Sequence, residues 1–193
     1  DGLYWMFFTS DGIGVKYSQD STNWKDGAPI FQKPLAWWKS YVPAKTDFNI
    51  WAPEIFFYNG KYNLYYSVSN FGGKNSVIGL MQCTSILKGD WKDQGAVIAS
   101  SSSTKYNCID PSFIYAQAPY MVFGSFFDGI YIVRLSSSTM KPNGNLVKIA
   151  SRNDGHNAIE GPCIWNGGNG YFYFFASFDK CCSGINSTYS IRY

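Results

Sequence analysis

The sequence predicts an all-β protein built as a β-propeller, from three observations. Four segments share the pattern small residue, x, aromatic, x, apolar, aromatic, with a serine two or three places further on. Their marker aromatics are 58, 58 and 52 residues apart: Tyr4, Tyr62, Tyr120 and Phe172. A fixed period of this size indicates a radial repeat, in which each unit is a small antiparallel sheet packed on its neighbours. The third observation is an acidic residue at a similar position in three of the four repeats.

Three repeats carry an acid beside a proline, upstream of the marker aromatic. Glu54, Asp110 and Glu160 precede their aromatics by 8, 10 and 12 residues. Each repeat is therefore expected to begin with a strand that carries a carboxylate, and the innermost strands of a propeller line one central channel. The same distances counted back from Tyr4 end upstream of Asp1. We expect the acid of the first repeat, and the start of the first blade, to lie outside this chain.

Strand signals follow one another along the whole chain. Runs rich in aromatic and β-branched residues lie between Gly, Asn, Asp and Ser clusters, at 62–68, 120–127, 129–135 and 171–176. No window of 11 or more residues sustains a helical apolar period. Residues 99–107 are a polar connection leading into the expected strand of Asp110. Because the repeats continue across every such segment, we predict one catalytic domain over 1–193, truncated at both ends.

Composition argues against nucleic-acid and membrane partners. Aromatic residues make up 19% of the chain and charged residues 15%, against about 25% charged in average domains. The net charge of +3 comes with no basic run, so a nucleic-acid partner is not expected. No apolar stretch approaches the ~20 residues of a membrane helix. These features favour an all-β domain that handles sugars.

The five cysteines give a compartment signal. Without a Cys-x₂-Cys spacing, and with His156 as the only histidine, a structural zinc site is not expected. Cys108 and Cys163 lie in or beside apolar runs and are predicted to be buried small hydrophobes. Adjacent Cys181 and Cys182 in a Gly/Ser loop suggest a vicinal disulfide, which needs an oxidising compartment. The sequon at 186–188 fits secretion.

Several motifs, in order along the chain, resemble one known family. They are Trp-Ala-Pro-Glu-Ile at 51–55, Ile-Asp-Pro-Ser at 109–112, Ile-Glu-Gly-Pro at 159–162 and the Cys-Cys-Ser-Gly…Asn-Ser-Thr-Tyr run at 181–189. Together they closely resemble the arabinanases of glycoside hydrolase family 43. The resemblance implies a five-bladed β-propeller that cuts α-1,5-linked arabinan with inversion. It also implies that this chain covers about four blades of an incomplete ring.

Inverting hydrolysis needs an acid that protonates the leaving oxygen and a base that activates water, typically ~6.5–9.5 Å apart. By the resemblance, Glu160 is the general acid. Asp110 is the third carboxylate, which favours the protonated acid by like-charge repulsion and helps to orient it. The family's general base sits in a His-Asp-Pro or similar motif that opens blade one, so it is expected upstream of Asp1. The chain alone is expected to bind weakly and not to turn over.

The remaining site residues also follow from the resemblance. Trp51 and Phe71 match positions that line the arabinose groove, and Asn107 and Ser125 complete the expected substrate-binding set. Glu54 aligns with the acids of the repeat, but the family's catalytic carboxylates lie elsewhere, so structural and substrate-adjacent roles both stay open. No metal or cofactor is expected in this segment, although a structural metal ion such as calcium fits the central channel of a complete protein. The expected partner is arabinan, bound by a secreted monomer.

Two other functions stay open at this stage. One is a noncatalytic carbohydrate-binding propeller that has kept the groove without the chemistry. The other is an exo-acting arabinofuranosidase or β-xylosidase of the same family. The run at 181–189 favours the arabinanase branch. Endo or exo action depends on whether loops close one end of the groove, which the sequence does not show.

Overall fold

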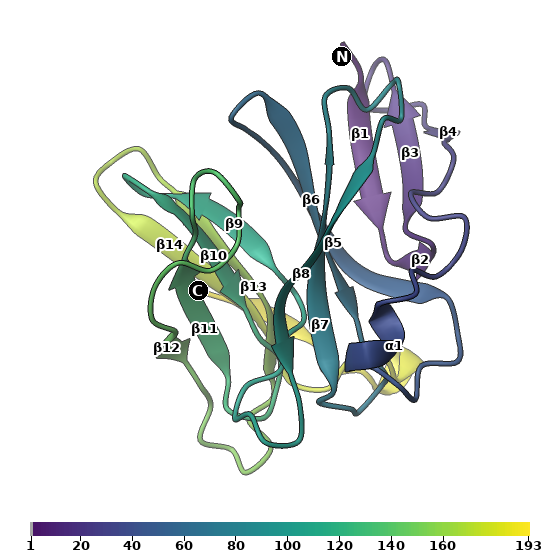
Figure 1. Cartoon of the computed structure of the whole chain (residues 1–193). Helices are drawn as coiled ribbons and strands as arrows, with labels where there is room; N and C mark the ends of the chain where they lie inside the picture. Colours follow the sequence, from purple (N-terminus) through teal and green to yellow (C-terminus); the bar gives the residue numbers. More distant parts are fainter. Residues whose placement is uncertain (1) are drawn as a thin grey trace.

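A computed structural model describes residues 2–193, so Asp1 lies outside the described part of the chain. Its strands form four sheets, coloured along the chain from purple to yellow in Figure 1, and every paired strand is antiparallel. The first sheet holds β1 (Tyr4–Phe8), β3 (Gly14–Ser18) and β4 (Lys25–Asp26), and the second holds β2 (Ser10–Asp11), β5 (Asn49–Tyr58), β6 (Lys61–Val68), β7 (Ser76–Cys83) and β8 (Lys92–Ser100). The third holds β9 (Ser112–Tyr115), β10 (Pro119–Phe123), β11 (Ile130–Arg134) and β12 (Val147–Ala150), and the fourth holds β13 (Ile159–Asn166), β14 (Phe172–Phe178) and β15 (Ser190–Arg192).

The predicted repeat is confirmed at the level of strands. The marker aromatics lie on β1, β6, β10 and β14. In the last three repeats this strand pairs with the strand just before it, as β5 with β6, β9 with β10 and β13 with β14. Short hairpin connections explain the order, because antiparallel neighbours can be joined by a tight turn. The repeat seen in the sequence is therefore one sheet of the fold.

Three apolar clusters fill the spaces between successive sheets. Ile13 and Phe31, near the first sheet, pack with Leu64 and Tyr66 of β6. The opposite face of the second sheet packs on the third sheet through a cluster that includes Tyr65, Ile78, Met121 and Phe123. Val122, Ile130, Ile159 and Ala176 join the third sheet to the fourth. Face-to-face packing of this kind positions one edge of each sheet toward a common centre.

In three repeats, the residue before a proline near the start of the repeat has a left-handed backbone, and we call this feature the proline frame. Ala52, Asp110 and Gly161 each precede a proline and have positive φ angles of 44°, 57° and 57°. On β5 the register shifts between Trp51 and Glu54, and on β13 it shifts between Glu160 and Cys163. The prolines stand nine, nine and ten residues before the marker aromatics. Bulges re-aim the side chains around them, and here the two bulged segments carry Glu54 and Glu160.

Four details differ from the sequence prediction. Asp110 lies before β9, because its left-handed backbone and the missing N–H of Pro111 delay pairing until Ser112. The polar connection expected at 99–107 begins later, since β8 runs to Ser100. Cys163 is exposed, because the bulge in β13 turns it away from the core, whereas Cys108 is buried as predicted.

The fourth difference is a helix that the sequence did not indicate. Helix α1 (Trp38–Tyr41) is a single turn, and the 3₁₀ helix η1 (Gly184–Asn186) is shorter still. Both are too short to produce a helical apolar period. Trp38 fixes α1 in place, since it is buried and its ring packs against Phe31. Neither helix of residues 2–193 is long and apolar enough to cross a membrane.

Candidate active site

One large cavity collects the residues predicted to be functional. It has a volume of about 1500 Å³ and is bordered by segments of the second, third and fourth sheets. Its lining includes all the predicted site residues: Trp51, Phe71, Asn107, Asp110, Ser125 and Glu160, together with Glu54. Pockets for drug-sized ligands measure about 300–1,000 Å³. The larger volume suits a segment of an extended ligand.

Glu160 on β13 is held from two sides. Its Oε2 accepts a hydrogen bond from the Ser125 hydroxyl at 2.9 Å, and its Oε1 accepts one from the Tyr189 hydroxyl at 2.9 Å. Burial, followed by the charge of Glu160, raises the pKa of Tyr189 well above its ordinary value, although Ser177 opposes this. Tyr189 is therefore a permanent donor. In the sequence, Tyr189 stands at the end of the motif at 181–189, and that position is the signal of its role.

Asp110 connects the second sheet to the fourth. Its backbone N–H donates to the Ser67 hydroxyl on β6 at 3.1 Å, and its Oδ2 accepts from the Gly161 N–H on β13 at 3.0 Å. Burial, and then the charge of Glu160, raise the pKa of Asp110 to about 7 against the opposing effect of Gly161. Near neutral pH the Asp110–Glu160 pair therefore carries fewer than two negative charges.

Glu54 on β5 has a structural role. Its Oε1 accepts a hydrogen bond from the Phe113 N–H of β9 at 3.0 Å, and the Ser112 hydroxyl also donates to this carboxylate. Burial raises the pKa of Glu54, and these two donors lower it. The carboxylate therefore ties the second sheet to the third at the cavity wall. Since it also lines the cavity, contact with a ligand remains compatible with this role.

The repeat serines contact the acid-bearing segments of the following repeats. Ser67 closes the second repeat and holds the backbone of Asp110, while Ser125 closes the third and donates to Glu160. Both serines are buried. The sequence pattern contained these serines without indicating a purpose. Their structural purpose is to fix each acid from the neighbouring sheet.

The predicted substrate contacts fall into two groups. Trp51 lies at the cavity wall, with its Nε1 donating to Asn49 Oδ1 at 2.8 Å and Lys45 Nζ lying 5.6 Å from its ring centroid, whereas Phe71 is 82% exposed. Asn107 and Ser125 are each only 3% exposed. The Oδ1 of Asn107 already accepts from Ser76 at 2.7 Å, and Ser125 binds Glu160. Sugar contact by all four residues stays a prediction.

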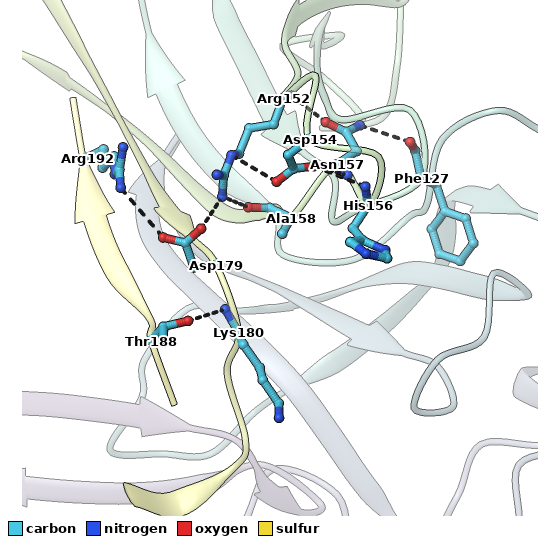
Figure 2. A network of polar contacts seen from close by, with 10 residues as sticks. All are labelled: Phe127, Arg152, Asp154, His156, Asn157, Ala158, Asp179, Lys180, Thr188 and Arg192. Carbon is cyan, nitrogen blue, oxygen red and sulfur yellow. Dashed lines mark hydrogen bonds and ion pairs between the residues drawn. The ribbon is translucent and has the colours of Figure 1, made fainter. Parts of the chain in front are cut away.

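An ion-pair network braces the rim near Glu160 (Figure 2). Arg152, which follows β12, contacts Asp154 through Nε at 3.1 Å and Asp179 through Nη1 at 2.5 Å. Arg192 of β15 contacts the other oxygen of Asp179 at 3.6 Å. Both guanidinium groups lie over the Phe178 ring, at 5.0 and 5.3 Å. Sequence reasoning missed this network, because scattered single charges give no pattern that points to a cluster.

His156 and possible metal ligands were the remaining candidates at this cavity. His156 lies in the exposed loop between Arg152 and Ala158 and borders the cavity, and Figure 2 shows its ring pointing away from the ion pairs. Within residues 2–193, no group of three or more His, Cys, Asp or Glu side chains could hold a metal ion. A structural metal ion in the central channel of a complete protein stays a prediction.

Comparison with known proteins identifies the family. The model of "Glycosyl hydrolases family 43" matches residues 1–193. The chain belongs to that family. This membership agrees with the resemblance noted from the motifs. Similar solved structures of the family 43 arabinanases are five-bladed propellers, and the four open sheets seen here are part of such a ring.

Three similar proteins define this family 43 chain more closely. It is 50% identical over 184 residues to "Extracellular endo-alpha-(1->5)-L-arabinanase 1" of Bacillus subtilis, covering 94% of this chain and 56% of that protein. The native arabinanase Arb43A structure of Bacillus subtilis matches with a TM-score of 0.91 at 47% identity, covering 99% of this chain and 67% of the other. A Cellvibrio cellulosa α-L-arabinanase complexed with arabinohexaose matches with a TM-score of 0.90 at 31% identity, covering 99% and 66%. The chain thus spans about half the length of the curated relatives it matches.

Proposed function

We propose that this chain is the part of an α-1,5-arabinan hydrolase that carries the general acid. The observation that carries the proposal is the Glu160–Asp110 pair, in which one carboxyl group receives two hydroxyl donors and the other has a raised pKa. The Bacillus subtilis relative is named as an endo-arabinanase, which favours endo over exo action. The arabinohexaose complex of a similar structure supports a polymer of arabinose as the ligand.

The chemistry follows from the pair. Glu160 protonates the glycosidic oxygen as the bond to the leaving sugar breaks, and water attacks from the opposite face with the help of a base. Burial and the charge of Glu160 raise the pKa of Asp110 to about 7, so near that pH the pair holds a proton beside the glycosidic bond. Ser125 and Tyr189 keep the carboxyl in place while its charge changes. We assign the base to the part of the relatives' length that this chain does not span.

Secretion as a monomer completes the proposal. The Bacillus subtilis relative is named as extracellular, and a polysaccharide substrate is too large to enter a cell intact. Size-exclusion chromatography of the protein, together with fractionation of cells that produce it, tests both points. A membrane-bound or cytoplasmic protein would contradict the localisation, and a stable dimer would contradict the monomer.

The deciding experiment uses the protein that contains this chain with its natural flanking sequence. We expect hydrolysis of linear α-1,5-arabinan with inverted products by NMR. Glu160→Gln should lower kcat by about 10²–10⁴-fold, the usual contribution of a general acid. An aryl arabinofuranoside with a good leaving group needs little protonation, so Glu160→Gln should lose far less activity on it. Asp128→Asn, at another cavity carboxylate, is the matched control and should keep most activity.

The outcomes separate the enzyme from a binding module. If the wild-type protein binds arabino-oligosaccharides but releases no sugar, it is a noncatalytic carbohydrate-binding module and not a hydrolase. If Glu160→Gln loses equal activity on arabinan and on the activated aryl substrate, Glu160 is not the general acid. Hydrolysis of xylan in preference to arabinan would move the protein to the β-xylosidase alternative.

A further inference from the structure

Lys45 has a side chain that lies inside the protein, behind the wall of the cavity. This side chain is only 6% exposed, and lysine is rarely buried so deeply unless it is paired. Its Nζ atom donates to Asp47 Oδ1 at 2.7 Å and to the Ser69 carbonyl at 3.0 Å. Ser69 lines the cavity, whereas Lys45 does not. The ammonium group therefore acts on a ligand in the cavity only through its neighbours.

The aromatic neighbour of Lys45 is Trp51, a predicted sugar contact at the cavity wall. Lys45 Nζ lies over the Trp51 ring, 5.6 Å from its centroid, which is within the ~6 Å over which a cation is attracted to an aromatic face. Indole is the best aromatic partner for this attraction, and the attraction is stronger where water is excluded. The ammonium group therefore covers one face of the ring from inside the wall.

Hydrogen bonds close a circuit between Lys45 and the edge of the same ring. Asp47 Oδ1, which accepts from Lys45, also accepts from the Asn49 N–H at 2.9 Å. Asn49 Oδ1 in turn accepts from Trp51 Nε1 at 2.8 Å. The hydrogen bond from Lys45, and less strongly that from Asn49, lower the pKa of the Asp47 carboxyl against the opposing effect of burial. Trp51 is thus held on its face by Lys45 and at its edge by Asn49, and Asp47 connects the two.

Helix α1 anchors the backbone that carries Lys45. The Lys45 N–H donates to the Val42 carbonyl at 3.1 Å, and the Val42 N–H donates to the Trp38 carbonyl at 2.9 Å. Trp38 and Val42 are both buried in the apolar cluster that joins the first and second sheets. Because buried residues fix this turn, the single-turn helix places Lys45 beside Trp51.

We propose that Lys45 is a positioning residue for sugar binding, because its ammonium group fixes the Trp51 ring in the orientation that receives an arabinose unit. The inference rests on the proposed function, which gives the cavity an arabinan ligand. A ring that is fixed before the ligand arrives loses less freedom on binding, and such preorganisation improves affinity. The ring binds substrate and transition state alike, so loss of Lys45 should raise KM and leave kcat nearly unchanged.

Kinetics and calorimetry test this role in the protein with its natural flanking sequence. Lys45→Met removes the charge and both hydrogen bonds but keeps an unbranched side chain. We expect KM for linear arabinan to rise about tenfold, the scale of a lost cation–π contact, with kcat changed by less than about twofold. The Kd for arabinohexaose, measured in a Glu160→Gln background, should rise with KM. An unchanged Kd, or a loss confined to kcat, would overturn the proposal.

A matched control and a second variant sharpen the test. Lys16→Met also breaks a pair between lysine and aspartate, since Lys16 Nζ lies 2.5 Å from Asp26 Oδ1, but neither residue lines the cavity. It should change neither KM nor Kd. Asp47→Asn weakens the hold on Lys45 from a side chain that is 58% exposed, so this variant should fold even if Lys45→Met does not. We expect Kd to rise several-fold in Asp47→Asn, and an unchanged value would count against the proposal.

A double substitution shows whether Lys45 acts through Trp51. In a Trp51→Ala background, Lys45→Met should weaken arabinohexaose binding by less than about twofold, because the ring on which it acts is gone. The same tenfold loss in both backgrounds would mean that Lys45 acts by another route and would overturn the proposal.

Tryptophan NMR tests the positioning without any sugar. In protein that contains isotope-labelled tryptophan, the indole signal missing from Trp51→Ala belongs to Trp51. We expect its N–H to exchange with water several-fold faster in Lys45→Met and at the original rate in Lys16→Met. A protein that neither binds nor cleaves arabinan would refute the proposed function. Arabinan hydrolysis with unchanged KM and unchanged exchange in Lys45→Met would refute this inference alone.

Discussion

The second and fourth sheets carry the same sequence motif but differ greatly in burial. On β6, Leu64 and Tyr65 are fully buried, whereas at the same motif positions on β14 Phe174 and Phe175 are only partly buried, and the marker Phe172 is 49% exposed. The second sheet has an apolar cluster on each face, and the fourth packs through one cluster among the described residues. The motif therefore specifies the strand, while the number of neighbouring sheets decides what the strand buries. Stability in such arrays comes largely from interfaces between units.

The largest expected effect is a cavity in the second sheet. Leu64→Ala should lower the free energy of unfolding by about 3 kcal/mol, the usual cost of deleting a buried leucine side chain. Phe172→Ala at the exposed motif position should cost about 1 kcal/mol or less, because surface positions contribute little. Urea unfolding followed by fluorescence measures both. Equal losses would mean that the fourth sheet is covered in solution.

A methyl group added at a glycine should give the second largest difference in stability between the two sheets. A Cβ on Gly79 of β7 would lie 2.3 Å from Cζ of the buried Tyr66, and overpacking of a core costs about 1–3 kcal/mol. Gly167, after β13, is the matched control, since its Cβ would also meet a tyrosine ring, at 2.5 Å from Tyr173. Tyr173 can turn into solvent. Gly79→Ala should therefore lower the melting temperature clearly and Gly167→Ala only slightly, and the reverse order would break the comparison.

Asp110 links the two regions, and its titration should appear in stability. Its pKa is raised from 3.8 to about 7 in the folded chain, so between these values the folded state binds more protons than the unfolded state. The stabilisation from this group is complete at low pH and is lost as pH rises through about 7. Asp110→Asn should flatten the decline in urea midpoint from pH 4 to 8.

Glu54→Gln serves as the companion variant, because the pKa of Glu54 is also raised by burial. It should remove a separate part of the same slope. An unchanged slope in Asp110→Asn, with all of it lost in Glu54→Gln, would assign the titration to Glu54 alone.

The smallest expected effect concerns the rim of the fourth sheet. Asp179→Asn removes the carboxylate that pairs with Arg152 and Arg192. Since ion pairs at a surface that water still reaches contribute little and are screened by salt, we expect a small drop in melting temperature at low ionic strength that shrinks in concentrated salt. Asp26→Asn, at a pair whose acid is 81% exposed, should give no measurable change. A larger drop for Asp179→Asn in high salt would show that the network acts through packing on Phe178.

Sequence reasoning went furthest where a signal repeats. The marker aromatics and acids located the strands and brought Glu54, Asp110 and Glu160 to one cavity. The prediction that Asp110 lies on a strand was wrong, because residue type alone does not reveal a left-handed backbone before a proline. Sequence reasoning also missed α1, whose single turn is shorter than any helical period.

The contacts around the acids were harder to foresee. Tyr189 and Glu160 are 29 residues apart, and Arg152 and Asp179 are 27 apart. Such pairs depend on how one loop lies against another, which local patterns do not encode. The exposure of Cys163 has the same origin, since one bulge reverses which face a residue occupies.

The proline frame has a consequence for how an asymmetric site can arise on a repeated scaffold. The backbone turn before each proline is the same in three repeats, yet Glu54 follows its proline, Asp110 directly precedes one, and Glu160 stands two places before one. Sliding an acid by one or two positions along a fixed turn needs only point substitutions, with no insertion to disturb the ring. Duplicated units can thereby acquire different tasks, and a ring of similar sheets can carry an asymmetric site. A polymer whose two ends differ needs such a site to be bound in one orientation.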